Sequence, residues 1–284
     1  MSSFNRYTFI LSAATPVSHG DVQTGVNNTT NIRLFMRAAM RVRGVPMRVP
    51  QLSENAIRSV LFRIPLHEHL LRTLDVGPKE LPQGVVNLLF AGGNLAAGSN
   101  HWDANHLGHL VTKLYPSLSL LGGATDHFVL PRSKLRLAAW PLAREFVPYI
   151  GGIATEERIA EAEDVSIFDL LFEETKVRGT GDEVSGNQML YGYETLAAGA
   201  KFLCELTLPH HAPPEVLGAI TTALDSWDGY FGGQGRQGRG RMTLQSEGLP
   251  DATPYADWLD SYADTMLAGL RDGTLGTDKP LVAA

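Results

Sequence analysis

Residues 231–241 read Phe-Gly-Gly-Gln-Gly-Arg-Gln-Gly-Arg-Gly-Arg. Glycine adopts positive φ angles without steric cost, so such a run can curl and turn backbone N–H groups toward an anion. The arginines add planar, permanently charged groups that match phosphate oxygens. The composition therefore indicates a phosphate-binding loop, although a flexible basic linker would share it.

The flanking segments predict a helix before this loop and a strand after it. From Pro213 onward the apolar residues fall on one helical face: Val216, Leu217, Ile220, Leu224 and Trp227. Residues 241–245 alternate as a strand does. A Walker loop or a dinucleotide-binding loop lies between a strand and the helix that follows it. The reversed order here excludes both.

Strands and helices also alternate in the rest of the chain. We expect strands over 6–12, 32–42, 47–49, 134–139 and 201–208, with a helix over 34–40 as the alternative for the second. A helix should begin after Ser53, a good N-cap, and Pro65 should end or kink it. These elements predict an α+β fold with an elaborated ferredoxin-like or RRM-like core. The sheet of such a core often binds single-stranded RNA.

Composition fits a globular, cytoplasmic protein. The chain has 284 residues, of which 44% are hydrophobic, and no apolar run reaches the ~20 residues of a membrane span. We see no signal-peptide pattern at the N-terminus, and the single cysteine, Cys204, cannot form an internal disulfide. We therefore expect a cytoplasmic location and no membrane partner.

Charge is distributed unevenly along the chain. The net charge is −6, yet residues 33–72 hold eight arginines and two glutamates, whereas residues 156–174 hold eight acidic residues and one arginine. Such a division can place a basic groove on one face of an acidic protein, and can also serve the docking of identical subunits.

A metal site is not expected. His101, Asp103, His106 and His109 lie close together, but no cysteine joins them and the H-E-x-x-H spacing is absent. We predict no metal and no cofactor.

Two ordered sets of motifs resemble the RAMP superfamily of CRISPR-associated proteins. Residues 16–20 (Pro-Val-Ser-His-Gly) and 49–58 (Val-Pro-Gln-Leu-Ser-Glu-Asn-Ala-Ile-Arg) are similar to the N-terminal motifs of the superfamily. Residues 189–202 and the loop 232–241 are similar to its C-terminal motifs. The stretch 117–123 resembles the type IV variety. Glu54 and Asn55 depart from the motif, which has small residues there.

The resemblance implies a single domain over 1–284, with a palm, a helical finger lobe inserted at 81–130 and a thumb hairpin at 173–193. It implies a backbone subunit that coats a guide (crRNA) RNA as a filament of its own copies, with other CRISPR effector subunits and a DNA or RNA target as partners. The RNA-binding residues carried over by position are His19, Ser53, Asn55, Arg58, Arg178, Met189, Gln234, Arg236, Gln237 and Arg239.

No catalytic residue is expected, although two enzymatic alternatives remain. Type III relatives cut target RNA with an aspartate after the first strand, where residues 27–30 here read Asn-Asn-Thr-Thr. Asp21 lies nearby and would be the acid of such a nuclease. A guide-processing endoribonuclease would use His19 instead. A third alternative is a single-strand binding protein unrelated to CRISPR.

Overall fold

The computed structural model describes residues 4–27, 30–42, 44–93, 104–125, 129–178 and 189–277. Its central sheet is antiparallel and has the strand order β10-β1-β9-β6. The strands are β1 (Phe4–Ala13), β6 (Arg136–Pro141), β9 (Lys201–Pro209) and β10 (Met242–Glu247). Helices connect β1 to β6 and β9 to β10, which is the ferredoxin-like arrangement. The predicted α+β class is confirmed.

The first connection contains one long helical segment of three parts. These are α1 (Glu54–Ile57), a π-helical stretch η1 (Arg58–Arg63) and α2 (Ile64–Thr73). Ser53 is the N-cap, as predicted, and its Oγ accepts from the N–H of Ala56 at 3.1 Å. Of the two outcomes predicted for Pro65, an end of the helix does not occur, because the helix continues as α2. Pro65 occupies the first turn of α2, where a missing N–H costs least.

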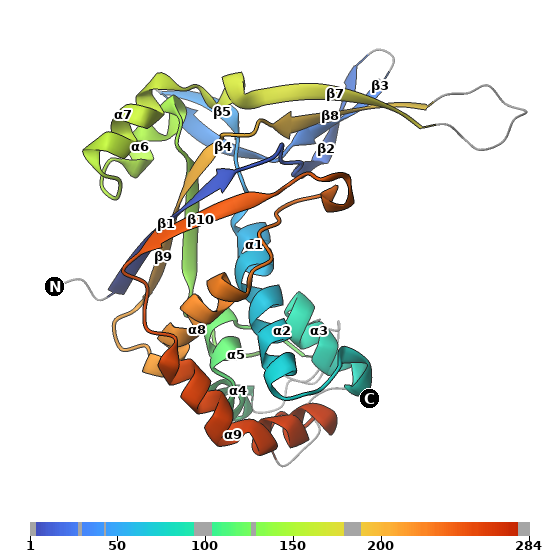
Figure 1. Ribbon diagram of the computed structural model, residues 1–284, viewed down its shortest axis with the longest axis vertical. Helices are drawn as coiled ribbons and strands as arrows, with labels where there is room; N and C mark the ends of the chain where they lie inside the picture. Colours follow the sequence, from blue (N-terminus) through green and yellow to red (C-terminus); the bar gives the residue numbers. More distant parts are fainter. Residues whose placement is uncertain are drawn as a thin grey trace, which may run out of the picture.

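Several further helices form a lobe below the sheet in Figure 1. They are η2 (Pro78–Glu80), α3 (Gln83–Ala91), α4 (Ala104–Leu114), α5 (Pro116–Leu121), α8 (Pro214–Ser226) and α9 (Thr253–Arg271). The segment 81–130, predicted as an inserted lobe, holds α3, α4 and α5. Because α5 packs on α8, these helices join the same lobe as the core helices.

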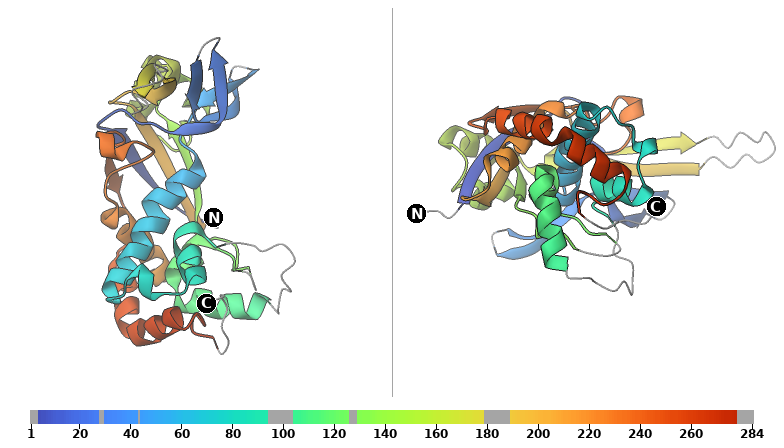
Figure 2. Two further views of the ribbon diagram at one scale, coloured as in Figure 1. Left: turned by 90° about the vertical axis from the view of Figure 1, so that its right-hand side faces the viewer. Right: turned by 90° about the horizontal axis from the view of Figure 1, so that it is seen from below.

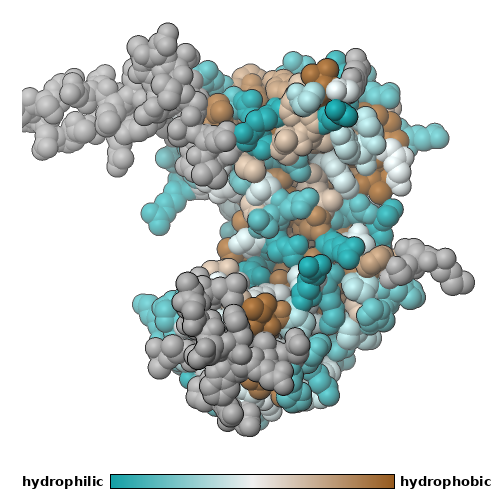
Figure 3. All heavy atoms as spheres, turned by 180° about the vertical axis from the view of Figure 1, so that it is seen from behind, coloured by the Kyte–Doolittle hydropathy of each residue, from teal (hydrophilic) through white to brown (hydrophobic). Residues whose placement is uncertain are grey.

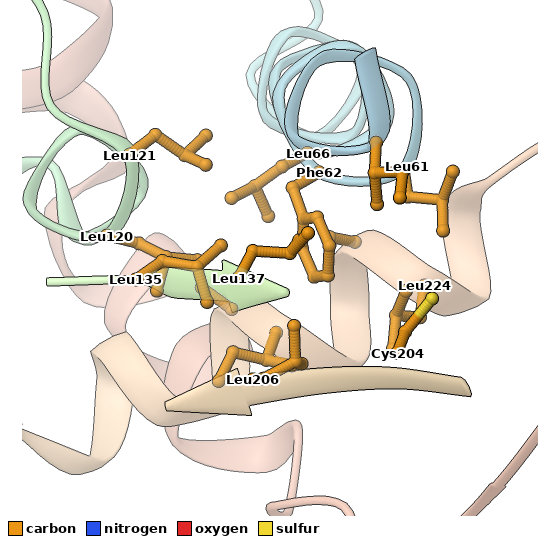
Figure 4. Packing of buried hydrophobic residues seen from close by; sticks show 14 of the residues in the cluster. Leu61, Phe62, Leu66, Leu120, Leu121, Leu135, Leu137, Cys204, Leu206 and Leu224 are labelled. Atoms are coloured by element: carbon orange, nitrogen blue, oxygen red, sulfur yellow. The ribbon is translucent and has the colours of Figure 1, made fainter. Parts of the chain in front are cut away.

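The main core lies between this lobe and one face of the sheet. Figure 4 shows Phe62 and Leu66 of the long helix pointing toward Leu137 of β6 and Leu206 of β9, all buried. The inward set predicted for residues 201–208 is confirmed: Phe202, Cys204, Leu206 and Leu208. Leu203 faces the opposite side of the sheet. There it joins a smaller cluster with Ile10, Leu142, Ile150 and Ala162.

That opposite side is covered at one end by short helices, namely η3 (Arg144–Phe146), α6 (Val147–Ile150), α7 (Glu156–Asp164) and η4 (Ile167–Leu170). A hairpin of β4 (Arg37–Val42) and β5 (Val45–Pro50) lies beside η4. The predicted strand 32–42 is thus extended rather than helical. It is divided at Met36 between β3 and β4.

A second sheet has the order β2-β3-β8-β7 and carries a projecting hairpin. Its strands are β2 (Gly20–Asn27), β3 (Thr30–Phe35), β7 (Leu171–Arg178) and β8 (Met189–Leu196). We call the antiparallel pair β7–β8 the arm, and Figures 1 and 2 show it extending away from the body. The predicted thumb, 173–193, falls on the arm, and its residues 179–188 lie outside the described chain.

Candidate nucleic-acid interface

Three segments that are distant in sequence meet below the base of the arm. They are the segment after β1, the start of α1 and residues 232–241, which we call the glycine-rich loop. The N–H of Gly233 donates to the carbonyl of Ser18 at 2.7 Å, and that of Gly240 to Pro16 at 2.9 Å. Gly232 has φ +83°, and a Cβ there would lie 2.3 Å from the Ser18 oxygen. This close approach explains the glycine. The glycine-rich loop therefore packs against the segment that follows β1, on the side from which the arm projects (Figure 1, orange).

His19 connects that segment to the start of α1. Its Nε2 accepts a hydrogen bond from the N–H of Ser53 at 3.2 Å. Its ring also meets Phe35 and Phe231 edge-on, with centroids 5.9 Å and 5.4 Å away. As an acceptor, Nε2 is unprotonated, so the neutral ring carries its proton on Nδ1. Two predicted site residues, His19 and Ser53, are thus brought into contact with each other.

Several backbone N–H groups of the glycine-rich loop donate to other groups of the protein. Besides Gly233 and Gly240, the N–H groups of Gln237 and Gly238 donate to carbonyls within the loop, and that of Arg241 donates to Oγ1 of Thr15 at 2.9 Å. The residues 235–237 form a single 3₁₀ turn between residues in the left-handed region. These donating N–H groups are not available to an anion, whereas the side chain of Arg236 on this turn is exposed.

Of the three arginines in the loop, Arg236 and Arg239 are predicted RNA contacts, and they have different surroundings. The side chain of Arg236 is exposed, and the structure gives it no partner among the described residues. Arg239 forms a bidentate ion pair with Glu174 of β7, with Nη1 2.7 Å from Oε1 and Nη2 against Oε2. It also lies over the ring of Tyr193, 5.4 Å from the centroid. Gln234 and Gln237, the other predicted loop contacts, are half-buried and exposed, respectively.

Asn55 is exposed beside a cavity of about 290 Å³ at the start of α1, which is lined by Met36, Ala38, Gln51, Leu52, Ser53, Glu54 and Asn55. Arg58, one turn further on, is turned inward. Its Nη1 donates to Oγ of Ser133 at 2.7 Å, and burial lowers its pKa. Asn55 therefore lies at the surface of the site, whereas Arg58 binds the segment that leads into β6.

Arg178 and Met189 are the outermost described residues of the arm and stand opposite each other in its register. Their side chains lie outside the described part of the structure.

The basic segment 33–72 supplies less surface charge than its composition predicts. Arg63 is buried and donates to the carbonyls of Leu88, Leu121 and Gly122, and burial lowers its pKa to about 10. Those carbonyls are at the C-terminal ends of α3 and α5, where the helix dipole favours a cation. Arg41, Arg48 and Arg72 are exposed. Figure 3 shows the molecule hollowed between the part that bears the arm and the helical lobe.

Among the residues the structure describes, no three metal-binding side chains come together. His106 and His109 are exposed on α4, and the other two candidates, 101 and 103, lie outside the described ranges. Every helix in the same ranges is too short or too polar to span a lipid bilayer.

The fold is shared with a solved protein. The chain is similar to one in a structure titled "Type IV-B CRISPR Complex", with a TM-score of 0.61 and 16% sequence identity, over 92% of this chain and 100% of that one. At this identity the likeness shows the fold alone. No family model and no curated protein matches the sequence.

Proposed function

We propose that this chain is a non-catalytic backbone subunit of a CRISPR ribonucleoprotein. It oligomerises along a guide RNA and holds the phosphate backbone, so that the bases remain free to pair with target DNA or RNA. The observation that carries the proposal is the meeting of the segment after β1, the start of α1 and the glycine-rich loop below the arm. The fold likeness to a CRISPR-complex chain supports it.

The side chains at this place can bind a sugar-phosphate strand. Arg236 is an exposed cation on a tight turn, and Asn55 offers an amide beside the cavity at the start of α1. Such groups bind phosphate and sugar oxygens, which do not vary with sequence. The net charge of −6 is compatible with this role because only the bound strand needs a basic surface.

The non-catalytic part of the proposal rests on residue types. A nuclease of this class would carry its aspartate at residues 27–30, and here these residues are two asparagines and two threonines. An amide neither accepts a proton at neutral pH nor brings negative charge to a divalent cation.

The test is a binding titration with single-stranded RNAs of equal length and unrelated sequence. We expect equal affinities within about threefold, and log affinity falling linearly with log salt by about 0.7 per phosphate contact. Longer strands should bind more copies of the chain. A duplex of the same length serves as the control. Absence of binding, or a strong preference for one sequence, would contradict the proposal.

A further inference from the structure

The base of the arm carries two carboxylates on opposite faces. In the β7–β8 register, Glu174 stands opposite Tyr193 and Glu173 opposite Glu194. Because side chains alternate along a strand, Glu174 shares a face with Tyr193, and Glu194 points to the other face. Each carboxylate meets an arginine from a different part of the chain.

On one face, Glu174 meets Arg239 of the glycine-rich loop. Besides the two guanidinium contacts, its oxygens accept from Oγ1 of Thr195 at 3.0 Å and from the hydroxyl of Tyr193 at 3.2 Å. The side chain of Arg239 is only 18% exposed. The hydrogen bonds from Arg239 are the first cause that lowers the pKa of Glu174 to about 2, so the pair stays ionised at neutral pH.

On the other face, Glu194 meets Arg37 at the start of β4. Nη2 of Arg37 lies 2.6 Å and 2.8 Å from the two carboxylate oxygens, and the N–H of Phe35 donates to one of them at 2.8 Å. Both side chains are about one-fifth exposed, at 21% and 17%. The two pairs thus connect the arm to the loop on one face and to the β3–β4 junction on the other.

We propose that Arg37 and Arg239 are positioning residues that fix the direction of the arm relative to the glycine-rich loop. Each arginine is committed to a carboxylate of the arm, and Arg239 is therefore not a phosphate ligand. Bidentate geometry restricts orientation as well as distance, and removing one partner leaves the other charge partly buried. The part of this inference that concerns RNA rests on the proposed function.

The first test needs no RNA. Spin labels on Glu173→Cys in the arm and Asp264→Cys on α9, both exposed, report the distance between arm and lobe. Cys204 is fully buried and has a raised pKa, which protects it from labelling. We expect one narrow distance distribution in the parent and broader ones in Arg37→Gln and Arg239→Gln. Arg6→Gln, which breaks the Arg6–Glu205 pair away from the arm, is the matched control and should leave the distribution narrow. Unchanged distributions in both arm variants would overturn the proposal.

The second test is a double-mutant cycle on RNA affinity with Glu174→Gln, Arg239→Gln and the double variant. If Arg239 acts through Glu174, all three should lose affinity by a similar factor, roughly tenfold, with an unchanged salt slope. If Arg239 binds phosphate instead, Glu174→Gln would strengthen binding and Arg239→Gln would lower the slope by about 0.7. That result would overturn the assignment. A parent that binds no RNA would contradict the proposed function and leave the distance result standing.

Discussion

The backbone N–H of Ser53 donates to Nε2 of His19 across 34 positions of sequence. Through this bond the N-cap of the long helix is attached to the segment that follows β1. That segment in turn contacts the glycine-rich loop. The N-cap of a helix, a loop and a histidine therefore form one structural unit. Its disruption should lower the free energy of unfolding as well as RNA affinity.

His19 should contribute mainly to stability. Replacing it with alanine leaves the Ser53 N–H without its acceptor and removes the edge contacts to Phe35 and Phe231. We expect a loss of about 1–3 kcal/mol in the free energy of unfolding, measured in denaturant. The salt slope of RNA binding should stay unchanged. A stable variant with a slope lower by about 0.7 would instead make His19 a phosphate contact.

Three glycine variants separate steric clash from backbone strain in the loop. Gly238→Ala imposes only strain, because φ is +76° and no atom lies within 4 Å of the new Cβ. Gly233→Ala imposes neither, since its nearest atom is 3.8 Å away. Gly232→Ala imposes both. We expect the free energy of unfolding to fall little for Gly233→Ala, by about 1 kcal/mol for Gly238→Ala and by more for Gly232→Ala. Equal losses at all three positions would refute the close packing of the loop on Ser18.

Arg236 is the loop arginine expected to contact RNA. Arg236→Ala should weaken binding to every single-stranded RNA alike and reduce the salt slope by about 0.7. Arg271→Ala, in the helical lobe, is the control and should change neither, because that side chain is half-exposed beside Glu80. An unchanged slope in Arg236→Ala would remove this residue from the interface.

The Glu174–Arg239 pair predicts a specific acid response. The pKa of Glu174 is lowered from 4.5 to about 2, so its charged form stabilises the fold above pH 4.5 and that contribution is lost as the pH falls toward 2. The side chain is 31% exposed, so solvent screens part of the effect. Unfolding free energies of the parent and Glu174→Gln should therefore differ most at neutral pH and converge below pH 4.5. A constant difference down to pH 2 would contradict the ion pair.

The absence of catalysis is tested with assembled complex, labelled target RNA and magnesium. We expect the target to remain intact. Cleavage that disappears in Asp21→Ala would show that the chain is a nuclease and that Asp21 is its essential acid.

The sequence predicted the parts of the fold that depend on local periodicity. The alternation over 201–208, the Ser53 cap and the order of helix, loop and strand around residues 231–241 are all present. The π-helical stretch that precedes Pro65 was not predicted, because no local signal marks such a stretch. Arg63 in that stretch looks solvated in sequence, yet it is buried against helix ends that only the folded chain brings together.

The candidate site was predictable in position and less so in detail. The motifs identified the segments that meet, but the partner of Arg239 depends on the strand register of the arm, which no spacing reveals. Glu174 lies in an acidic run typical of a solvated surface. Its pairing with Arg239 follows only from the folded structure, in which β7 lies beside the glycine-rich loop.

The most direct test of the central claim is to purify the chain from cells that express its guide RNAs and to sequence the nucleic acid that copurifies. The account predicts RNA of uniform length whose molecules share a common tag and differ elsewhere. Protein free of nucleic acid, or RNA fragments of mixed length without a shared tag, would contradict it.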